Sequence, residues 1–346
     1  MTSVEREAQL EREELEADLD EAPTQTWWAR IVLAQGALIG LILIGLIVGF
    51  SILSSSSFDS IANARNIATD TAILLVLSVG EAYVIITAGI DLSIGAVLIF
   101  SGVVADKAML AAGGDGWAVI LIGLVVCLGC GIAWGTLNGV LVAKTRISPL
   151  IATLGTFGIA EGLAFVMTGG VDLSNVPMKL VTTIGAGRAF NQVPWLVIIA
   201  FATALVFGII LRFHRFGRHT YAIGSSQEAA LRSGILVDRH LIKVYALAGC
   251  MSGLAGFLSL ARFATTTIAG HETDNLRAIT AVVIGGTSLF GGIGTMLGTV
   301  FGAFIPTVLQ NGFVIVGIQP FWQQAAVGTV LIVAVVIDRL RRSSQN

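Results

Sequence analysis

Apolar runs of about twenty residues recur along most of this chain, and they constrain its fold more than any other feature. A helix needs about 20 consecutive apolar residues to cross the hydrocarbon core of a bilayer. Of the 346 residues, 55% are hydrophobic and only 12% are charged, whereas soluble domains carry about 25% charged residues. We therefore expect an all-α, polytopic transmembrane helical bundle in the cell membrane.

The runs predict about ten spans. The expected spans are 31–53, 67–88, 96–112, 117–143, 149–168, 195–211, 241–261, 278–290, 297–316 and 321–337. An even number places both termini on one side of the membrane, and lysine and arginine concentrate on the cytoplasmic side. With the termini inside, the cytoplasmic segments hold fourteen of the 20 basic residues. We expect both termini and the loop 213–241 to be cytoplasmic.

Charge divides the chain into three parts. Residues 1–30 form an acidic cytoplasmic tail, 31–338 the transmembrane domain, and 339–346 a basic cytoplasmic tail. The acidic tail has no basic segment ahead of an apolar run, so it does not resemble a signal peptide. No face is basic enough to suggest nucleic acid as a partner, which leaves membrane lipid and other proteins.

The loop 213–241 is the longest polar interruption of the apolar body and contains the pattern of a short helix. Ser225 or Ser226 can cap its start, and Ser225-x-x-Glu228 fits a capping box. Two alanines favour helix after Glu228, and Gly234 suits the left-handed stop position. A helix of about two turns is unstable by itself. Packing within the chain or against a partner must hold it.

Glycine and polar residues interrupt the apolar runs at two places, one in each half of the chain. The first is Thr87-Ala-Gly-Ile-Asp-Leu-Ser-Ile-Gly95, and the second is Gly285-Gly-Thr-Ser-Leu-Phe-Gly-Gly-Ile-Gly294. Paired glycine-interrupted segments indicate discontinuous helices at a transport path. Tight turns between spans explain them equally well, and both interpretations stay open. The similarity of the two segments is too short to establish an internal duplication.

Polar residues within the apolar body are candidates for a transport path. A carboxylate at the bilayer centre is costly and should face protein or water. Asp91 can instead cap the following helix, and we favour that structural role. Glu81 and Glu161 can line a path or pair with Asn138, Lys107 or a backbone group. The candidate path residues are Glu81, Asp91, Ser93, Asn138, Glu161, Gly285, Gly286, Thr287 and Ser288.

Several motifs together resemble those of ribose-type ABC transporter permeases, the inner-membrane components of binding-protein-dependent transport. The matching segments are Tyr221-Ala-Ile-Gly224, Glu228-Ala-Ala230, Ser233-Gly-Ile235, Gly89-Ile-Asp-Leu-Ser93, Asn138-Gly139, Ile151-Ala-Thr-Leu-Gly155 with Gly169-Gly170, Ile284-Gly-Gly-Thr-Ser288 with Gly291-Gly292, and Pro320-Phe-Trp322. The resemblance covers most of residues 72–338. One departure is Ala88, where the family usually has glycine.

The resemblance implies the permease subunit of an ATP-driven importer for a small sugar such as ribose or another monosaccharide. It also implies a separate ABC ATP-binding subunit, an extracytoplasmic sugar-binding protein and a second permease subunit, identical or different. In that family the short cytoplasmic helix is the coupling helix that docks on the ATPase. The coupling residues expected here are Ser226, Glu228, Ala229, Ala230 and Gly234.

The chain lacks the Gly-x-x-x-x-Gly-Lys-Ser/Thr loop that holds ATP phosphates, so hydrolysis would occur on another chain. We expect no cofactor, no metal site and no catalytic residue.

Three other functions stay open or are considered as alternatives to a sugar ABC permease. The chain could be an ion-coupled secondary transporter that uses Asp91, Glu81 or Glu161, or an ABC permease for a nucleoside or a branched-chain amino acid. An intramembrane enzyme is disfavoured, because the apolar runs contain few histidines.

Overall fold

The computed structural model describes residues 35–271 and 273–319, together with six helical residues between 322 and 336. The long helices are α3 (Gln35–Leu53), α5 (Ile61–Ile86), α6 (Ile94–Ala112), α7 (Trp117–Ala143), α8 (Pro149–Thr168), α10 (Trp195–Phe213), α13 (Val237–Phe263) and α15 (Met296–Val316). The short elements are α4 (Ser55–Phe58), α9 (Met178–Leu180), the π-helical turn η1 (Val181–Gly185), the antiparallel strands β1 (Arg188–Ala189) and β2 (Val193–Pro194), α11 (Arg215–Ser225), α12 (Gln227–Arg232) and α14 (Asp274–Ile284).

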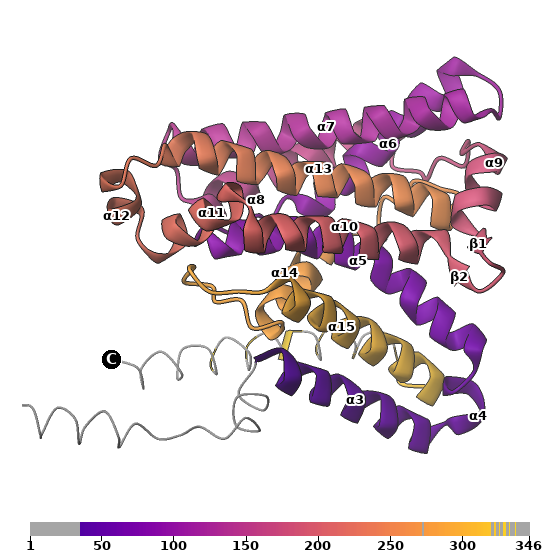
Figure 1. Ribbon diagram of the computed structural model, residues 1–346. Coiled ribbons are helices and arrows are strands. Elements are labelled where there is room, and N and C mark those ends of the chain that lie inside the picture. The colour runs from indigo at the N-terminus through magenta and orange to yellow at the C-terminus, as the bar shows by residue number, and fades with distance from the viewer. Residues whose placement is uncertain are drawn as a thin grey trace, which may run out of the picture.

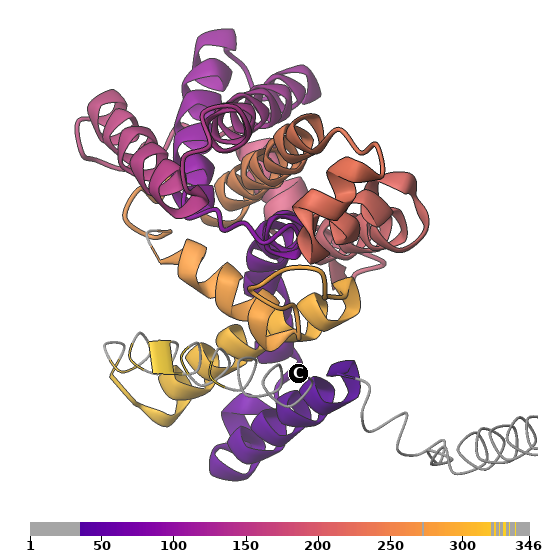
Figure 2. The ribbon, with the colours of Figure 1, turned by 90° about the vertical axis from the view of Figure 1, so that its left-hand side faces the viewer.

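Helix α5 is the centre of the bundle. It packs against α10, α13, α14 and α15, and nearly all of its residues after Ile67 are buried. Figures 1 and 2 show α3, α14 and α15 on one side of α5, with α6, α7, α8 and α13 on the other. Helices α11 and α12 lie at one end of the bundle, and α4 and the two strands lie at the opposite end (Figure 1).

The expectation of an all-α membrane protein is confirmed. Within the described residues, seven helices are long and apolar enough to cross a bilayer, and they are α5, α6, α7, α8, α10, α13 and α15. The count of ten spans and the cytoplasmic termini stay predictions. The acidic tail, the basic tail and most of the span expected at 321–337 lie outside the described residues.

Local sequence signals explain where several helices begin and end. Helix α8 begins at Pro149, which needs no amide partner in the first turn, and ends before Gly169 in the left-handed conformation. Helix α15 begins after Thr295, whose hydroxyl accepts a hydrogen bond from the amide of Gly298 at 3.1 Å. Several boundaries differ by two to four residues, as for α13, which begins at Val237 rather than at 241, and two expected boundaries differ by more. Helix α5 begins at Ile61, because Ser60 caps it inside a segment expected to be a connection.

The other wrong boundary is the span expected at 278–290. Helix α14 has only 11 residues and ends at Ile284, so it is about 16 Å long and too short for a hydrocarbon core of about 30 Å. Gly286 has a φ of 84°, which ends the helix although the apolar residues continue. Residues 285–295 then cross to α15 without helical structure.

Candidate functional site

Helices α11 and α12 fill the loop for which one short helix was expected. Ser226 is the N-cap of α12, and its hydroxyl accepts a hydrogen bond from the amide of Ala229 at 3.2 Å. The predicted capping box does not form, because Ser225 is the last residue of α11. Glu228 instead pairs with Arg232 one turn later, at 2.6 Å.

The end of α12 matches the prediction for Gly234. This residue has a φ of 84°, and the amides of Gly234 and Ile235 donate to the carbonyls of Leu231 and Ala230, each at 3.0 Å. This is a Schellman motif. Of the predicted coupling residues, Ala230 is buried, whereas Ser226, Glu228, Ala229 and Gly234 are exposed. Helix α12 is therefore a short, exposed helix anchored by one buried side chain.

Helix α11 connects this exposed helix to both interrupted segments. The amide of Gly292 donates to the carbonyl of Ile86 at 2.9 Å, which ties the second interruption to the end of α5. Gly224 lies against the same two residues: a Cβ there would be 1.7 Å from Ile86 O and 2.6 Å from Gly292 N. The hydroxyl of Tyr221 donates to the carbonyl of Gly294 at 2.7 Å. We call the backbone contact of Gly224, Ile86 and Gly292 the glycine joint.

Ala88 and Gly291 lie beside the glycine joint and contact it. Ala88 lies in the first interruption, two residues after Ile86, and has a φ of 62°. Residues other than glycine adopt this left-handed conformation only at a cost in free energy. A Cβ at Gly291 would lie 2.8 Å from both Ala88 Cβ and Gly224 O. Burial raises the pKa of the Tyr221 hydroxyl above its ordinary value, so this group remains a hydrogen-bond donor at neutral pH. The loop and both interruptions thus meet with almost no side chains between them.

Four of the candidate path residues form a buried polar cluster at the first interruption. The hydroxyl and the amide of Ser93 both donate to Asp91 Oδ1, at 2.6 and 2.9 Å. The amide group of Asn138 donates to Ser93 Oγ at 2.8 Å and approaches Asp91 Oδ2 at 3.4 Å. Glu81 Oε1 accepts from the backbone amide of Asp91 at 3.1 Å. Each of these four residues is at most 1% exposed.

This cluster holds the first interruption in shape. The prediction that Asp91 caps α6 is wrong, because the N-cap position belongs to Ser93. Asp91 instead accepts from the amide two residues later, in the manner of a turn. A Cβ on Gly89 would lie 2.6 Å from Tyr245 Oη, and Tyr245 lies within the first half of α13. The interruption is therefore beside a spanning helix rather than beyond its end. Glu81 Oε2 has no hydrogen-bond partner among the described residues.

Sequence reasoning missed two threonines of α8 that belong to this cluster. Thr156 Oγ1 donates to Asn138 Oδ1 at 2.7 Å. Thr153 Oγ1 accepts from the amide of Leu92 at 3.1 Å and contacts the carbonyl of Ile90 at 3.4 Å. No charged residue lies within one helical turn of either threonine. The only sequence signal that includes either of them is the family motif at residues 151–155, which contains Thr153. The structure does not place Glu161 beside them: it is half-buried and more than one turn farther along α8.

The second interruption contains the remaining candidates. Gly285 approaches α15 so closely that a Cβ would lie 2.6 Å from the carbonyl of Gly298, and Gly286 ends α14. Thr287 and Ser288 are at most 2% exposed. The amide of Ser288 donates to the carbonyl of Ile293 at 3.0 Å. These residues build a compact turn and do not line either of the two grooves described below.

A serine, a histidine and an aspartate form a hydrogen-bonded chain near the other end of the bundle. His271 contacts Ser259 Oγ through Nε2 at 2.7 Å and Asp274 Oδ2 through Nδ1 at 2.6 Å. This order resembles a hydrolase triad. Ser259 is only 2% exposed and does not line the adjacent groove, so its hydroxyl has no access to a substrate. The chain of hydrogen bonds fixes the loop after α13 instead.

Comparisons with known proteins agree with the motif resemblance. Residues 63–335 match a family model described as the permease component of branched-chain amino acid transport systems. The ribose import permease of Bacillus subtilis strain 168 is 36% identical over 304 residues, covering 88% of this chain and 92% of the relative. The D-allose transport system permease of Escherichia coli K12 is 36% identical over 292 residues, covering 84% and 87%.

A third relative, the fructose import permease of Rhizobium meliloti, is 31% identical over 305 residues and covers 86% of this chain and 84% of its own length. No solved structure matches the chain. The matched region includes the polar cluster, the glycine joint and α12. The chain belongs to the family of permease components of branched-chain amino acid transport systems, and within it to the ribose-type ABC transporter permeases.

Proposed function

We propose that this chain is the membrane permease subunit of an ATP-driven importer for a monosaccharide. The family and the ribose, allose and fructose permeases among its relatives support this function and do not favour an ion-coupled transporter. The partners are a separate ATP-binding subunit, an extracytoplasmic sugar-binding protein and a second permease subunit. Branched-chain amino acids and nucleosides are the competing cargoes, and the permease itself performs no catalysis.

The observation that carries the coupling part of the proposal is the glycine joint. Helix α12 is exposed, and its own Leu231 is 58% exposed, which suits docking on an ATPase. Helix α11 follows the movement of α12 and contacts the end of α5 and the second interruption through backbone atoms. Closure of the ATPase pair would displace α12 and, through Gly224, both interrupted segments. Such a displacement biases the membrane helices between two access states.

The polar cluster has a structural role in this proposal. Asp91, Ser93 and Asn138 satisfy one another and leave no open face, so they shape the first interruption rather than contact the cargo. Glu81 joins them through the amide of Asp91. The turn from Gly285 to Ser288 has the same role at the second interruption, and Glu161 remains a candidate path residue on α8.

Purification and transport test the proposal together. The tagged chain, solubilised from its native membrane, should bring a stoichiometric ATP-binding subunit that is identified by mass spectrometry. The complex is reconstituted into liposomes loaded with ATP, and uptake of labelled ribose, allose and fructose is measured in the presence of the sugar-binding protein. Uptake should require ATP inside and should persist with ionophores. A chain that purifies alone and accumulates its cargo only under an ion gradient would overturn the proposal.

Two variants of the coupling helix provide the matched test. Gly234→Val forces a β-branched residue into the left-handed region, whereas Gly234→Asn tolerates it. Gly234→Val should lose the ATP-binding subunit on purification and lose uptake, while membrane insertion is unchanged. Gly234→Asn should retain both. Equal recovery of the ATPase with the two variants would count against docking at α12.

A further inference from the structure

A polar groove opens between residues of α5, α14 and α15. Figure 1 shows these three helices beside one another. Its volume is about 400 Å³, which falls within the roughly 300–1,000 Å³ of small-molecule sites. The polar residues that line it are Asp70, His271, Asp274, Arg277, Thr307, Gln310 and Asn311. None of them was a candidate path residue in the sequence, because the motifs of the chain do not include them.

The groove places charged side chains within the membrane-spanning part of the bundle, where charged groups are rare. Asp70 lies on α5 sixteen residues before Ile86, so it is about 24 Å along the helix from the glycine joint. Asp274 and Arg277 lie in the first turn of α14, which is too short to span. Charged residues at membrane depth face protein or a water-filled cavity rather than lipid, and they mark the paths of polar cargo.

The charged residues that line the groove are paired with oppositely charged neighbours. Arg262 pairs with Asp70 at 3.1 Å, and Arg277 approaches Asp274 Oδ1 at 3.6 Å. His271 contacts the other oxygen of Asp274 at 2.6 Å. The groove therefore offers many donors and acceptors but little unpaired charge. Sugar hydroxyls are both donors and acceptors and suit such a surface, whereas an amino acid needs separate unpaired partners for its ammonium and carboxylate.

Gln310 is the residue best placed to contact a cargo. Its amide makes no side-chain hydrogen bond with another described residue, whereas its neighbour Asn311 is held by a reciprocal pair of hydrogen bonds to Asn63 at 2.8 and 2.9 Å. Gln310 is partly exposed and lines the groove. An amide supplies one acceptor and two donors, which matches a vicinal pair of hydroxyl groups.

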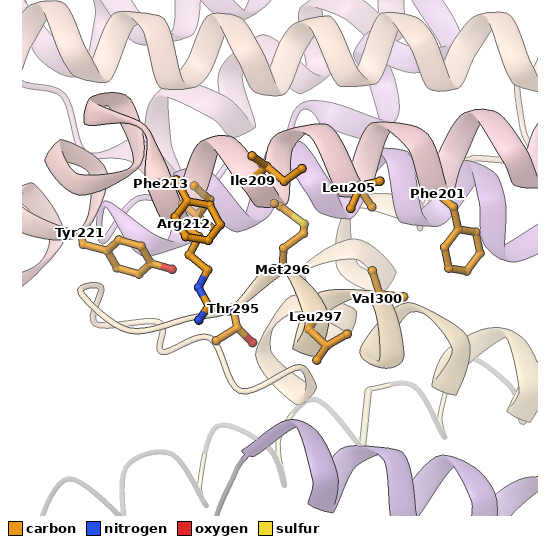
Figure 3. Close-up of a pocket in the computed structure, with 13 residues that line it drawn as sticks. Phe201, Leu205, Ile209, Arg212, Phe213, Tyr221, Thr295, Met296, Leu297 and Val300 are labelled. Atoms are coloured by element: carbon orange, nitrogen blue, oxygen red, sulfur yellow. The ribbon is translucent and has the colours of Figure 1, made fainter.

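A second groove offers a contrast. Figure 3 shows it between α10, α11 and the start of α15, lined mostly by apolar side chains such as Phe201, Leu205 and Met296. Its volume is about 640 Å³. Its polar groups gather at one end, where Tyr221 already donates to Gly294. A hydrated polyol would lose hydrogen bonds with water there without replacing them. The larger groove is therefore a poor sugar site.

We propose that the polar groove is a sugar-contact site of the permease, where a neutral monosaccharide enters from the extracytoplasmic side before it crosses the membrane. This inference rests on the proposed function and adds the place and the chemistry of the first contact. Asp70 and Arg277 contribute hydrogen bonds from within compensated pairs, and Gln310 contributes an amide that makes no side-chain hydrogen bond with another described residue. The contacts are few, which suits a site that has to release its cargo.

Thiol modification tests the site. Gln310→Cys is made in the full permease, reconstituted with the ATPase and the sugar-binding protein, and treated from outside with a bulky, charged, membrane-impermeant methanethiosulfonate. Uptake of ribose, allose and fructose and the rate of ATP hydrolysis are measured before and after treatment. Val316→Cys is the matched control, because it is exposed near the same end of α15 but does not line the groove. The unsubstituted chain, treated in the same way, reports on the three native cysteines.

Modified Gln310→Cys should lose uptake by about tenfold or more while ATP hydrolysis continues, because the passage is blocked but the coupling helix is intact. Treated Val316→Cys should transport normally. Unchanged uptake by modified Gln310→Cys, with labelling confirmed by mass shift, would overturn the sugar-contact site and leave the proposed function standing. If the untreated assembly transports none of the three sugars but carries an amino acid, the proposed function fails and the inference fails with it. Equal loss of uptake and ATP hydrolysis would indicate structural damage and likewise overturn the site.

Discussion

Replacement of Gly224 by alanine tests the glycine joint most directly. The new Cβ would lie 1.7 Å from Ile86 O and 2.6 Å from Gly292 N. Both obstructing atoms are backbone, so no side-chain rotation relieves the overlap. The distance to Ile86 O has to grow to at least 3.0 Å, which moves α11 away from α5 by more than 1 Å. Overpacking of this kind costs about 1–3 kcal/mol, and the Gly292–Ile86 hydrogen bond is lost or lengthened.

The expected result is an uncoupled transporter. Gly224→Ala should insert and purify with its ATPase, because α12 is untouched, but sugar uptake per ATP hydrolysed in proteoliposomes should fall by about tenfold. Thermal unfolding of the purified complex should shift to lower temperature. Gly155→Ala is the control, since a Cβ there meets nothing within 4 Å and alanine favours the helix. If Gly224→Ala matches Gly155→Ala in both uptake and unfolding temperature, the argument for the joint is refuted.

Three further predictions concern other parts of the site. Asn138→Leu should lower the free energy of unfolding by about 1–3 kcal/mol, because it leaves the buried Asp91 Oδ2 without its hydrogen-bond donor and removes one of the two acceptors of Thr156 Oγ1; thermal unfolding of the purified permease measures it, and an unchanged transition would contradict the cluster's structural role. Gly234→Val should strain α12 by about 1–2 kcal/mol and reduce recovery of the ATPase in pull-downs. Ala88→Gly should raise the unfolding temperature or leave it unchanged, because glycine relieves about 1 kcal/mol of left-handed strain; a clear decrease would contradict this.

The ends of helices could be predicted from the sequence where a residue such as proline or glycine restricts or frees the backbone angles at that position. The bounds of α7 and α8 agree with the sequence, because Trp117 and Pro149 mark their starts and Gly169 ends α8. Apolar length alone was a poor guide. It extended the eighth span to 290, although Gly286 turns the backbone at a φ of 84°, because hydropathy records which residues enter a membrane and not which of them are helical.

The candidate site was predictable in its parts but not in its assembly. The cap of α12 and its glycine stop follow from short-range rules, and both interruptions are visible as glycine runs. Nothing in the sequence indicates that Gly224 meets Ile86 and Gly292, because these contacts are made by backbone atoms that every residue has. The groove that contains Gln310 is equally hidden, because its polar residues come from three helices and the loop before α14, which only the fold brings together.

The structure offers two routes by which a movement of α12 could reach the membrane helices, and they differ in stiffness. One route runs into α13 through Ala230, which packs beside Val237 and Leu241. Helix α13 is continuous over 27 residues and approaches α7 with backbone contact at Gly249 and Gly131, so it moves only as part of a large body. The other route runs through α11 to the last residue of α5 and to the second interruption, which has no helical structure, so that its backbone angles can change without breaking a helix. Hinges are found at such element ends. We therefore propose the glycine joint as the place where a small displacement of α12 changes the shape of the membrane domain.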